Sequence, residues 1–388
     1  MGEMNTPTTP SNATLQWAQR LVQMSTISHQ SNLALIECIA DHLRTLHIPL
    51  RLSYDDGRQK ANLFATIGDG KPGGVILSGH TDTVPWEGQA WTLDPLSATL
   101  RDGRLYGRGS ADMKGYIAVC VAQAQALLQA DLPHAVHFAF SYDEEVGGYG
   151  VRRMVADLSD AGVKPAMCLI GEPTNMVPAL AHKGVHRWRC CVKGKPAHSS
   201  LTPIAVNAIE AASRVVAHIA DMADRWRAQG PYQPGFDVPY TTAAVGVMHG
   251  GIADNVVPED CHFHYEFRDL PGSDVAAMQQ SVLDRAAALE PAMKAVDAAT
   301  GIRFETIGDM PAFQARADEP AALLATRLAG SRETTRVAFG TEAGIFQRAG
   351  ISTVICGPGS INQAHQPDEF VSLEQLARCE AYVGALMA

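Results

Sequence analysis

FAFSYDEEVGGYG, residues 138–150, joins a strand-like segment to three consecutive acidic residues. Apolar residues alternate through residues 136–140, which predicts a buried strand that ends before Asp143, Glu144 and Glu145. Three adjacent carboxylates repel one another, so they need either a solvated loop or a neighbouring cation. Neighbouring side chains at a strand end point in opposite directions, so one glutamate can face a metal ion while the next faces another group. On this stretch alone, an acidic surface loop and a cation site both stay open.

Length and composition indicate a soluble globular chain large enough for two domains. The chain has 388 residues, of which 46% are hydrophobic and 19% are charged. A net charge of −10 argues against nucleic acid or an anionic membrane as partner. The polar residues 1–12 do not have the pattern of a secretory signal. The eight cysteines form no CxxC pair, which predicts reduced thiols and a cytoplasmic location.

Strand-like and helical segments alternate along the first part of the chain. Helical periodicity covers residues 15–24, 32–47, 116–129 and 150–161, and strand-like runs cover residues 62–67, 73–78 and 168–171. This alternation predicts an α/β fold, with a mostly parallel sheet and helices on both faces. Ligands bind beyond the carboxyl ends of the strands in such sheets.

The pattern changes after residue 183 and returns near residue 311. Between them the order strand, helix, strand, strand, helix, strand is typical of a separate α+β module, with its second helix expected at residues 273–299. We therefore predict one α/β domain formed by residues 1–182 and 311–388, interrupted by an inserted α+β domain at residues 183–310.

Two imidazoles and three carboxylates stand after short strands or in glycine-rich loops. They are His80, Asp112, Glu145, Glu172 and His365. This donor set suits zinc or a similar divalent ion. One carboxylate bridging two ions, with one histidine and one further carboxylate on each ion, accounts for all five residues. It also leaves room for a shared water molecule, which such ions acidify.

Two further acids fit around these residues. Asp82 lies two positions beyond His80 and could accept the ring N–H of that histidine. Glu144 would then be free to take a proton from the water. Taken singly, a His-x-Asp pair, an acidic loop or the loop histidine His365 is more often structural. The prediction of a metal site depends on the whole set.

Several segments together resemble the dinuclear zinc amidohydrolases. In chain order they are GHTDTVP (79–85), GRGSADMKG (107–115), DEEVGG (143–148), GEPT (171–174), KPAHSS (195–200) and GGIADNVVP (250–258). This family includes acetylornithine deacetylase, succinyl-diaminopimelate desuccinylase, aminoacylases and carboxypeptidase-G-like enzymes. The segments FGTEAG (339–344) and CGPGSINQAHQPDEF (356–370) are most similar to the acetylornithine deacetylase branch.

The resemblance implies a zinc-peptidase-like catalytic domain with two Zn²⁺ ions, or Co²⁺ in their place. It assigns His80 and Glu172 to one ion, Glu145 and His365 to the other, and Asp112 to the bridge between them.

The resemblance also assigns roles outside the metal ligands. Asp82 orients the first histidine, Glu144 is the general acid and base, and the peptide bond Asp112–Met113 is cis. The inserted domain becomes a lid and dimerisation domain, in which His198 and Asn255 reach the active site of a partner subunit.

Three further residues are candidates for holding the substrate. The resemblance assigns Arg268 to the substrate carboxylate. Glu342 offers an acid to a cationic substrate side chain, and Thr341 a hydrogen bond to the carboxylate. The alternative is that Glu342 only caps the helix that begins there.

The expected activity is hydrolysis of N-acetyl-L-ornithine to L-ornithine and acetate in arginine biosynthesis, by a cytoplasmic homodimer. Two alternatives stay open. One is another N-acyl-amino-acid hydrolase, such as an N-acetylcitrulline deacetylase, an aminoacylase or a dipeptidase. The other is an inactive, metal-stabilised scaffold, which would not need Glu144 as a base.

Overall fold

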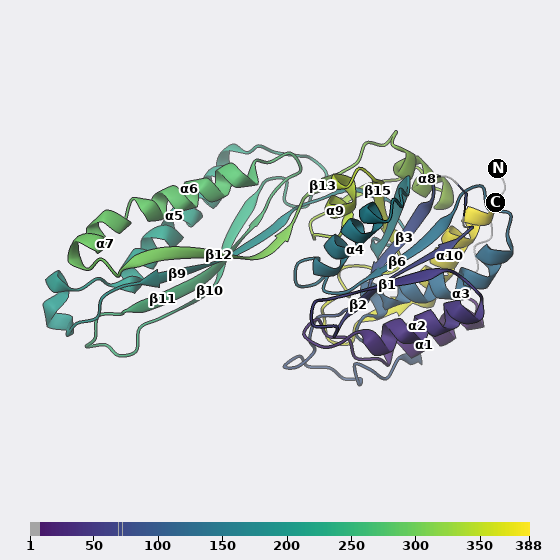
Figure 1. The fold of residues 1–388 in the computed structure, drawn as a ribbon, viewed down its shortest axis with the longest axis horizontal. Coiled ribbons are helices and arrows are strands. Elements are labelled where there is room, and N and C mark those ends of the chain that lie inside the picture. Colours follow the sequence, from purple (N-terminus) through teal and green to yellow (C-terminus); the bar gives the residue numbers. More distant parts are fainter. Residues whose placement is uncertain (1–7, 69, 72) are drawn as a thin grey trace. The chain divides into compact units, whose positions relative to one another are not determined.

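The computed structural model describes residues 8–68, 70–71 and 73–388, which form two compact units (Figure 1). The first unit contains the described residues up to Ala181, together with Phe313–Arg336 and Thr341–Ala388. The second contains His182–Ala312 and Val337–Gly340.

One sheet forms the centre of the first unit. Its strand order is β1-β2-β6-β3-β7-β15-β8-β13, and β14 pairs with β8. The inner strands β6, β3, β7 and β15 run parallel, whereas β1–β2, β2–β6 and β8–β15 pair antiparallel. The strands are β1 (Leu50–Tyr54), β2 (Ala61–Ile67), β3 (Val75–His80), β6 (Val136–Ser141), β7 (Met167–Pro173), β8 (Ala179–His182), β13 (Phe313–Gln314), β14 (Thr335–Val337) and β15 (Ser352–Gly357). The mostly parallel α/β sheet predicted from the sequence is confirmed.

Helices lie on both sides of this sheet (Figure 1). They are α1 (Asn12–Val22), α2 (Leu33–Thr45), α3 (Gly115–Gln129), α4 (Tyr149–Asp160), α8 (Pro320–Leu328), α9 (Ala343–Arg348), α10 (Leu373–Gly384) and the short η3 (Ala385–Met387). Helix α3 packs against both α1 and α10, and its consecutive residues Tyr116–Val121 are all buried. A helix that is apolar on all sides in this way belongs in a core rather than at a surface.

A small antiparallel sheet lies beside the amino-terminal end of α3. It joins β4 (Thr99–Arg101), β5 (Arg104–Tyr106) and β16 (Phe370–Ser372) in the order β16-β5-β4. An irregular turn, η1 (Ser110–Lys114), connects this region to α3. The sheet therefore brings the segment before α3 next to the segment before α10.

The second unit is an antiparallel sheet with helices packed against it. Its strand order is β10-β11-β9-β12, with β9 (Val185–Lys193), β10 (Thr242–Gly250), β11 (Asp260–Arg268) and β12 (Gly301–Met310). The helices are η2 (Ser199–Ile204), α5 (Ala208–Gln229), α6 (Val275–Ala287) and α7 (Glu290–Val296). Trp188, Phe263, Tyr265 and Phe267 lie in its core with one face of α5. The single helix expected at residues 273–299 is wrong, because the chain breaks before Pro291 and restarts as α7.

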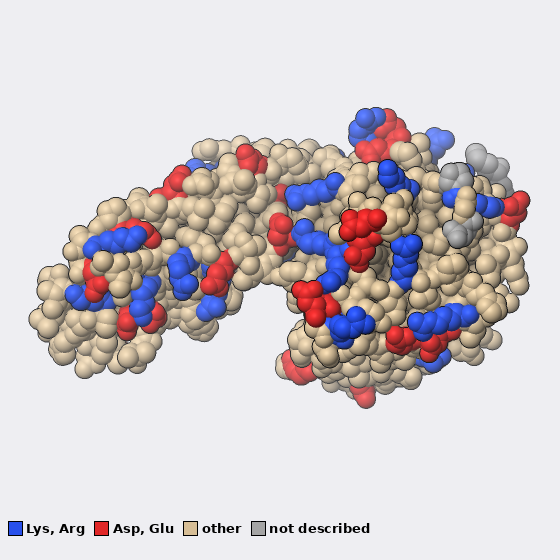
Figure 2. Space-filling view, viewed as in Figure 1, with Lys and Arg blue, Asp and Glu red and all other residues tan. Residues whose placement is uncertain are grey.

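The surface and the cysteines are those of an ordinary globular chain. Acidic and basic side chains are interspersed over the face shown in Figure 2. All eight cysteines are free thiols. None of the described helices combines the length and apolar character needed to cross a membrane.

A buried histidine gives the second unit a predicted pH dependence. His186 Nδ1 lies 2.7 Å from Asp309 Oδ1, and its Nε2 lies 3.1 Å from Asp269 Oδ1. Burial by itself lowers the pKa of His186, but the two aspartates outweigh burial and raise that pKa to about 9. The charged imidazole therefore stabilises the fold fully below the unfolded-state pKa of about 6.5, and the contribution is lost as the pH rises through 9.

We expect the melting temperature of the wild type to fall between pH 7 and pH 10 more than that of His186→Gln. The stabilisation by charged His186 that the wild type loses over this pH range is at most about 3 kcal/mol of unfolding free energy. Thermal melts of both proteins across this range test the expectation. Parallel curves for the two proteins would show that His186 does not contribute through its charge.

Candidate metal centre

Neighbouring parallel strands bring the candidate ligands to one edge of the central sheet. His80 is the last residue of β3, Glu172 lies near the end of β7, and Glu145 follows β6. Because these strands run parallel, their carboxyl ends meet at the same edge. Asp112 comes from the η1 turn and His365 from the loop after β15.

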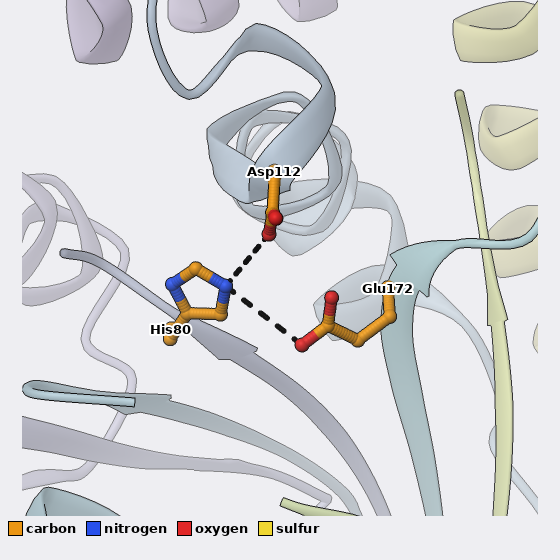
Figure 3. Close-up of side chains that lie close together, drawn as sticks. All are labelled: His80, Asp112 and Glu172. Atoms are coloured by element: carbon orange, nitrogen blue, oxygen red, sulfur yellow. Dashed lines mark hydrogen bonds and ion pairs between the residues drawn. The ribbon is translucent and has the colours of Figure 1, made fainter. Parts of the chain in front are cut away.

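His80, Asp112 and Glu172 form the first group of ligand atoms (Figure 3). His80 Nε2 lies 2.8 Å from Asp112 Oδ1 and 3.7 Å from Glu172 Oε1. All three side chains are buried. The other ring nitrogen of His80, Nδ1, lies 2.9 Å from the backbone carbonyl of Asp82, so Nδ1 carries a proton and Nε2 is the ring atom available to a metal ion.

Asp112, Glu145 and His365 form the second group. His365 Nε2 lies 3.1 Å from Glu145 Oε1 and 3.3 Å from Asp112 Oδ2. Asp112 thus turns one carboxylate oxygen toward each histidine, which is the geometry of a carboxylate shared between two ions. The peptide bond Asp112–Met113 is cis, as the resemblance implied.

Buried charges of one sign dominate the electrostatics of this centre. Burial and then the neighbouring Asp112 raise the pKa of Glu172 well above its ordinary value. Burial also raises the pKa of Glu145, with Asp112 adding to the effect. Burial would raise the pKa of Asp112 as well, but its contacts with His365 and His80 outweigh burial and lower it. Divalent cations would offset this repulsion, and the mixed nitrogen and oxygen donors fit such ions.

Asp82 supports the centre in a different way from the one expected. Its carboxylate Oδ1 lies 3.6 Å from His80 Nδ1, farther than its own backbone carbonyl. The carboxylate instead accepts hydrogen bonds from the Ser28 hydroxyl at 2.7 Å and from the backbone N–H groups of Glu144 and Glu145 at 3.1 and 3.3 Å. Asp82 therefore fixes the acidic loop as well as the first histidine.

The three consecutive acids have three separate environments. Asp143 pairs with Lys60, Glu145 belongs to the second ligand group, and Glu144 is 8% exposed between them. Burial, followed by the charge of Glu172, raises the pKa of Glu144 well above its ordinary value. A carboxylate in this setting has a higher proton affinity than an exposed one, which suits a proton acceptor.

Thr341 and Glu342 are both buried in the first unit. Glu342 is 1% exposed, and its two carboxylate oxygens accept hydrogen bonds from the hydroxyls of Ser78 and Ser141. Burial raises the pKa of Glu342 to about 7. The Thr341 hydroxyl accepts a hydrogen bond from the Ala343 N–H at 3.1 Å. Glu342 stands at the N-cap position of α9 but makes no capping hydrogen bond with its side chain.

The other candidates belong to the second unit. His198 is exposed, and its Nδ1 lies 2.8 Å from the Ser200 hydroxyl. Asn255 is also exposed, and its carbonyl accepts the Ser199 N–H at 3.0 Å. Arg268 donates to Glu266 on the same strand through Nε and Nη2. In this arrangement part of the Arg268 guanidinium is already occupied.

Ser28, Arg108 and Glu369 also belong to the surroundings of the centre, and sequence reasoning missed them. Arg108 and Glu369 lie inside two of the segments that carry the resemblance. Both are charged and both are 1% exposed, but only their position in the fold shows that they pair.

The sequence pattern of peptidase family M20/M25/M40 matches residues 76–388. The chain belongs to this family. An acetylornithine deacetylase from Proteus mirabilis is 35% identical over 362 residues, which cover 92% of this chain and 90% of the relative. An acetylornithine deacetylase from Aliivibrio salmonicida is 32% identical over 366 residues, which cover 92% of this chain and 93% of that relative. The resemblance inferred from the sequence segments is confirmed.

Solved structures of M20-family proteins share this fold. An M20-family metallo-carboxypeptidase from Sulfolobus solfataricus superposes with a TM-score of 0.77 at 15% identity, covering 97% of this chain and 99% of that chain. A dinuclear metal-binding M20 peptidase from Bacillus subtilis superposes with a TM-score of 0.66 at 16% identity, covering 96% of both chains. Membership makes this M20 protein an enzyme of a metal-dependent hydrolase family.

The two adjacent glutamates provide a matched pair of variants. We expect Glu145→Gln to lose one of two bound metal equivalents, because it removes a charged ligand from the second group. Glu144→Gln should keep both equivalents but lose hydrolytic activity by about 10²-fold to 10⁴-fold, the usual contribution of a general base. Elemental analysis of the zinc-loaded variants, with activity assays alongside, tests both expectations. Loss of a metal equivalent from Glu144→Gln instead would reverse the two assignments.

Proposed function

We propose that this M20 enzyme hydrolyses N-acetyl-L-ornithine to L-ornithine and acetate, as a step in arginine biosynthesis in the cytoplasm. Identity of 32–35% with acetylornithine deacetylases across 92% of the chain supports the substrate. The observation that carries the reaction type is the position of Asp112, with one carboxylate oxygen facing His80 and the other facing His365.

The proposed cofactor is a pair of Zn²⁺ ions, with Co²⁺ as the substitute. His80 and Glu172 would hold one ion, Glu145 and His365 the other, and Asp112 both. When bound, the ions polarise the amide carbonyl and make a water molecule nucleophilic at neutral pH.

The proposed proton transfers belong to Glu144. Its carboxylate takes a proton from the attacking water and returns it to the nitrogen of the leaving amine, so no net proton is consumed by the enzyme. Asp82 keeps Glu144 in place through the loop backbone and supplies the carbonyl that holds the ring proton of His80.

Residues of the second unit complete the proposed mechanism in a homodimer. We assign His198 to stabilising the oxyanion in the partner subunit, with Asn255 crossing in the same way, and Arg268 to the substrate carboxylate. Mixing His198→Ala subunits with Glu144→Gln subunits tests the trans arrangement. Activity should return in the mixed dimer, whereas a mixture as inactive as its parents contradicts the arrangement.

A substrate panel tests the proposed activity. Zinc-loaded protein should release acetate from N-acetyl-L-ornithine with a kcat/KM at least tenfold above that for N-acetylcitrulline, N-acetylmethionine or a dipeptide. Glu144→Gln, purified in parallel, controls for contaminating hydrolases. A preference for one of the other substrates would change the assignment within the family, and no hydrolysis of any would favour an inactive protein.

Glu342 provides a separate test of substrate selectivity. We propose that Glu342, which is buried and hydrogen-bonded to two serines, supports the centre and does not contact the substrate side chain. We therefore expect Glu342→Gln to lower kcat/KM by similar factors for N-acetylornithine and for N-acetylmethionine. A fall about tenfold larger for N-acetylornithine would show that the carboxylate recognises the cationic amine.

A further inference from the structure

A buried ion pair connects the segment that carries Asp112, the candidate ligand common to both groups, with the segment that carries His365. Arg108 Nη1 donates to Glu369 Oε2 at 2.7 Å, and both side chains are 1% exposed. Antiparallel pairing of β5 with β16 places them together, and the Gly107 N–H donates to the Glu369 carbonyl at 2.9 Å.

The other oxygen of the Glu369 carboxylate holds the turn that presents Asp112. Oε1 accepts hydrogen bonds from the backbone N–H of Ala111 at 3.0 Å and from that of Asp112 itself at 3.2 Å. Both belong to the irregular η1 turn, where Asp112 has φ −128° and ψ 92° instead of helical values. The backbone of the shared ligand is therefore fixed by a charged acceptor that lies outside its own turn.

The same ion pair reaches the His365 loop through a glutamine. Arg108 Nη2 donates to Gln89 Oε1, and Gln89 Nε2 donates to the backbone carbonyl of His365 at 2.9 Å. His365 has φ +62°, a conformation that a non-glycine residue keeps only when its surroundings hold it. The indole of Trp91 also donates to Gln89 Oε1 at 3.0 Å and lies beside the Arg108 guanidinium.

We propose that Glu369, Arg108 and Gln89 form a positioning network that sets the distance between Asp112 and His365, and thereby the affinity of the centre for its metal pair. This inference deepens the proposed function, since it rests on a two-ion centre at these residues. Glu369 acts on the shared ligand, so it affects both ions. Gln89 acts on the His365 backbone, so it affects the ion of the second group.

The chemistry of the network explains why an isosteric change should disturb it. In Glu369→Gln one carboxylate oxygen becomes an NH₂ group, which then faces either the Arg108 guanidinium or two backbone N–H donors. A buried donor is left without an acceptor in both orientations. Gln89→Met keeps the length of the side chain but removes all three of its hydrogen bonds, to Arg108, Trp91 and the His365 carbonyl.

Zinc titration of the metal-free variants, in competition with a chromophoric chelator, tests the network without any substrate. We expect Gln89→Met to weaken one of the two binding events by about tenfold, and Glu369→Gln to weaken both by at least that factor, as for other groups that orient metal ligands. Melting temperatures of the metal-free proteins provide the structural readout. The matched controls are Gln347→Met and Glu37→Gln, which alter exposed hydrogen bonds of the same unit.

Gln89→Met in a Glu145→Gln background should have no further effect on the remaining ion, because the second group is already lost. Unchanged zinc affinity in both single variants would overturn the inference, even if Glu369→Gln melted at a lower temperature. If Glu369→Gln does not fold, the zinc affinity of Gln89→Met decides the question alone, because Gln89 is only half-buried. Failure of the wild type to hydrolyse N-acetylornithine would overturn the proposed function but leave this result standing.

Discussion

Repulsion among the carboxylates of Asp112, Glu145 and Glu172 is the constraint on which the first unit depends. The parallel strands and the η1 turn bring these charges together at one edge of the sheet, and burial keeps water from screening Asp112 and Glu172. Two imidazoles relieve part of the repulsion, and cations would relieve the rest. The donor arrangement therefore fits a centre that is complete only with ions bound.

Close packing around the centre leaves little freedom for the residues that carry it. A Cβ atom at Gly171, the residue before Glu172, would lie 2.0 Å from Cγ of Tyr116 in the core helix α3. The same helix begins directly after the turn that presents Asp112. Strand β7, which carries Glu172, is thus in direct contact with helix α3, which follows Asp112. The hydrophobic core and the candidate metal centre therefore depend on the same packing.

The features that could be predicted from the sequence are those that depend on the local residue pattern and on the order of the motif segments along the chain. The alternation of strands and helices predicted the sheet. The positions of His80 and Glu172 at strand ends predicted that both lie at the same edge of that sheet. The hydrogen-bond partners of the individual side chains around the centre were not predictable, because they depend on how distant segments pair. Only the packed structure shows that the Asp82 carboxylate accepts a hydrogen bond from the backbone of the acidic loop, and that Glu342 accepts hydrogen bonds from two serine hydroxyls.

The chain leaves the first unit after Ala181 and returns to it at Phe313, which imposes an order on its synthesis. The ligands of the first group, His80, Asp112 and Glu172, all emerge from the ribosome before the second unit is made. His365 emerges only after that unit is complete, and β15 must then pair along β7. The second ligand group therefore stays incomplete until the last part of the chain has been made, whereas all three residues of the first group precede the second unit.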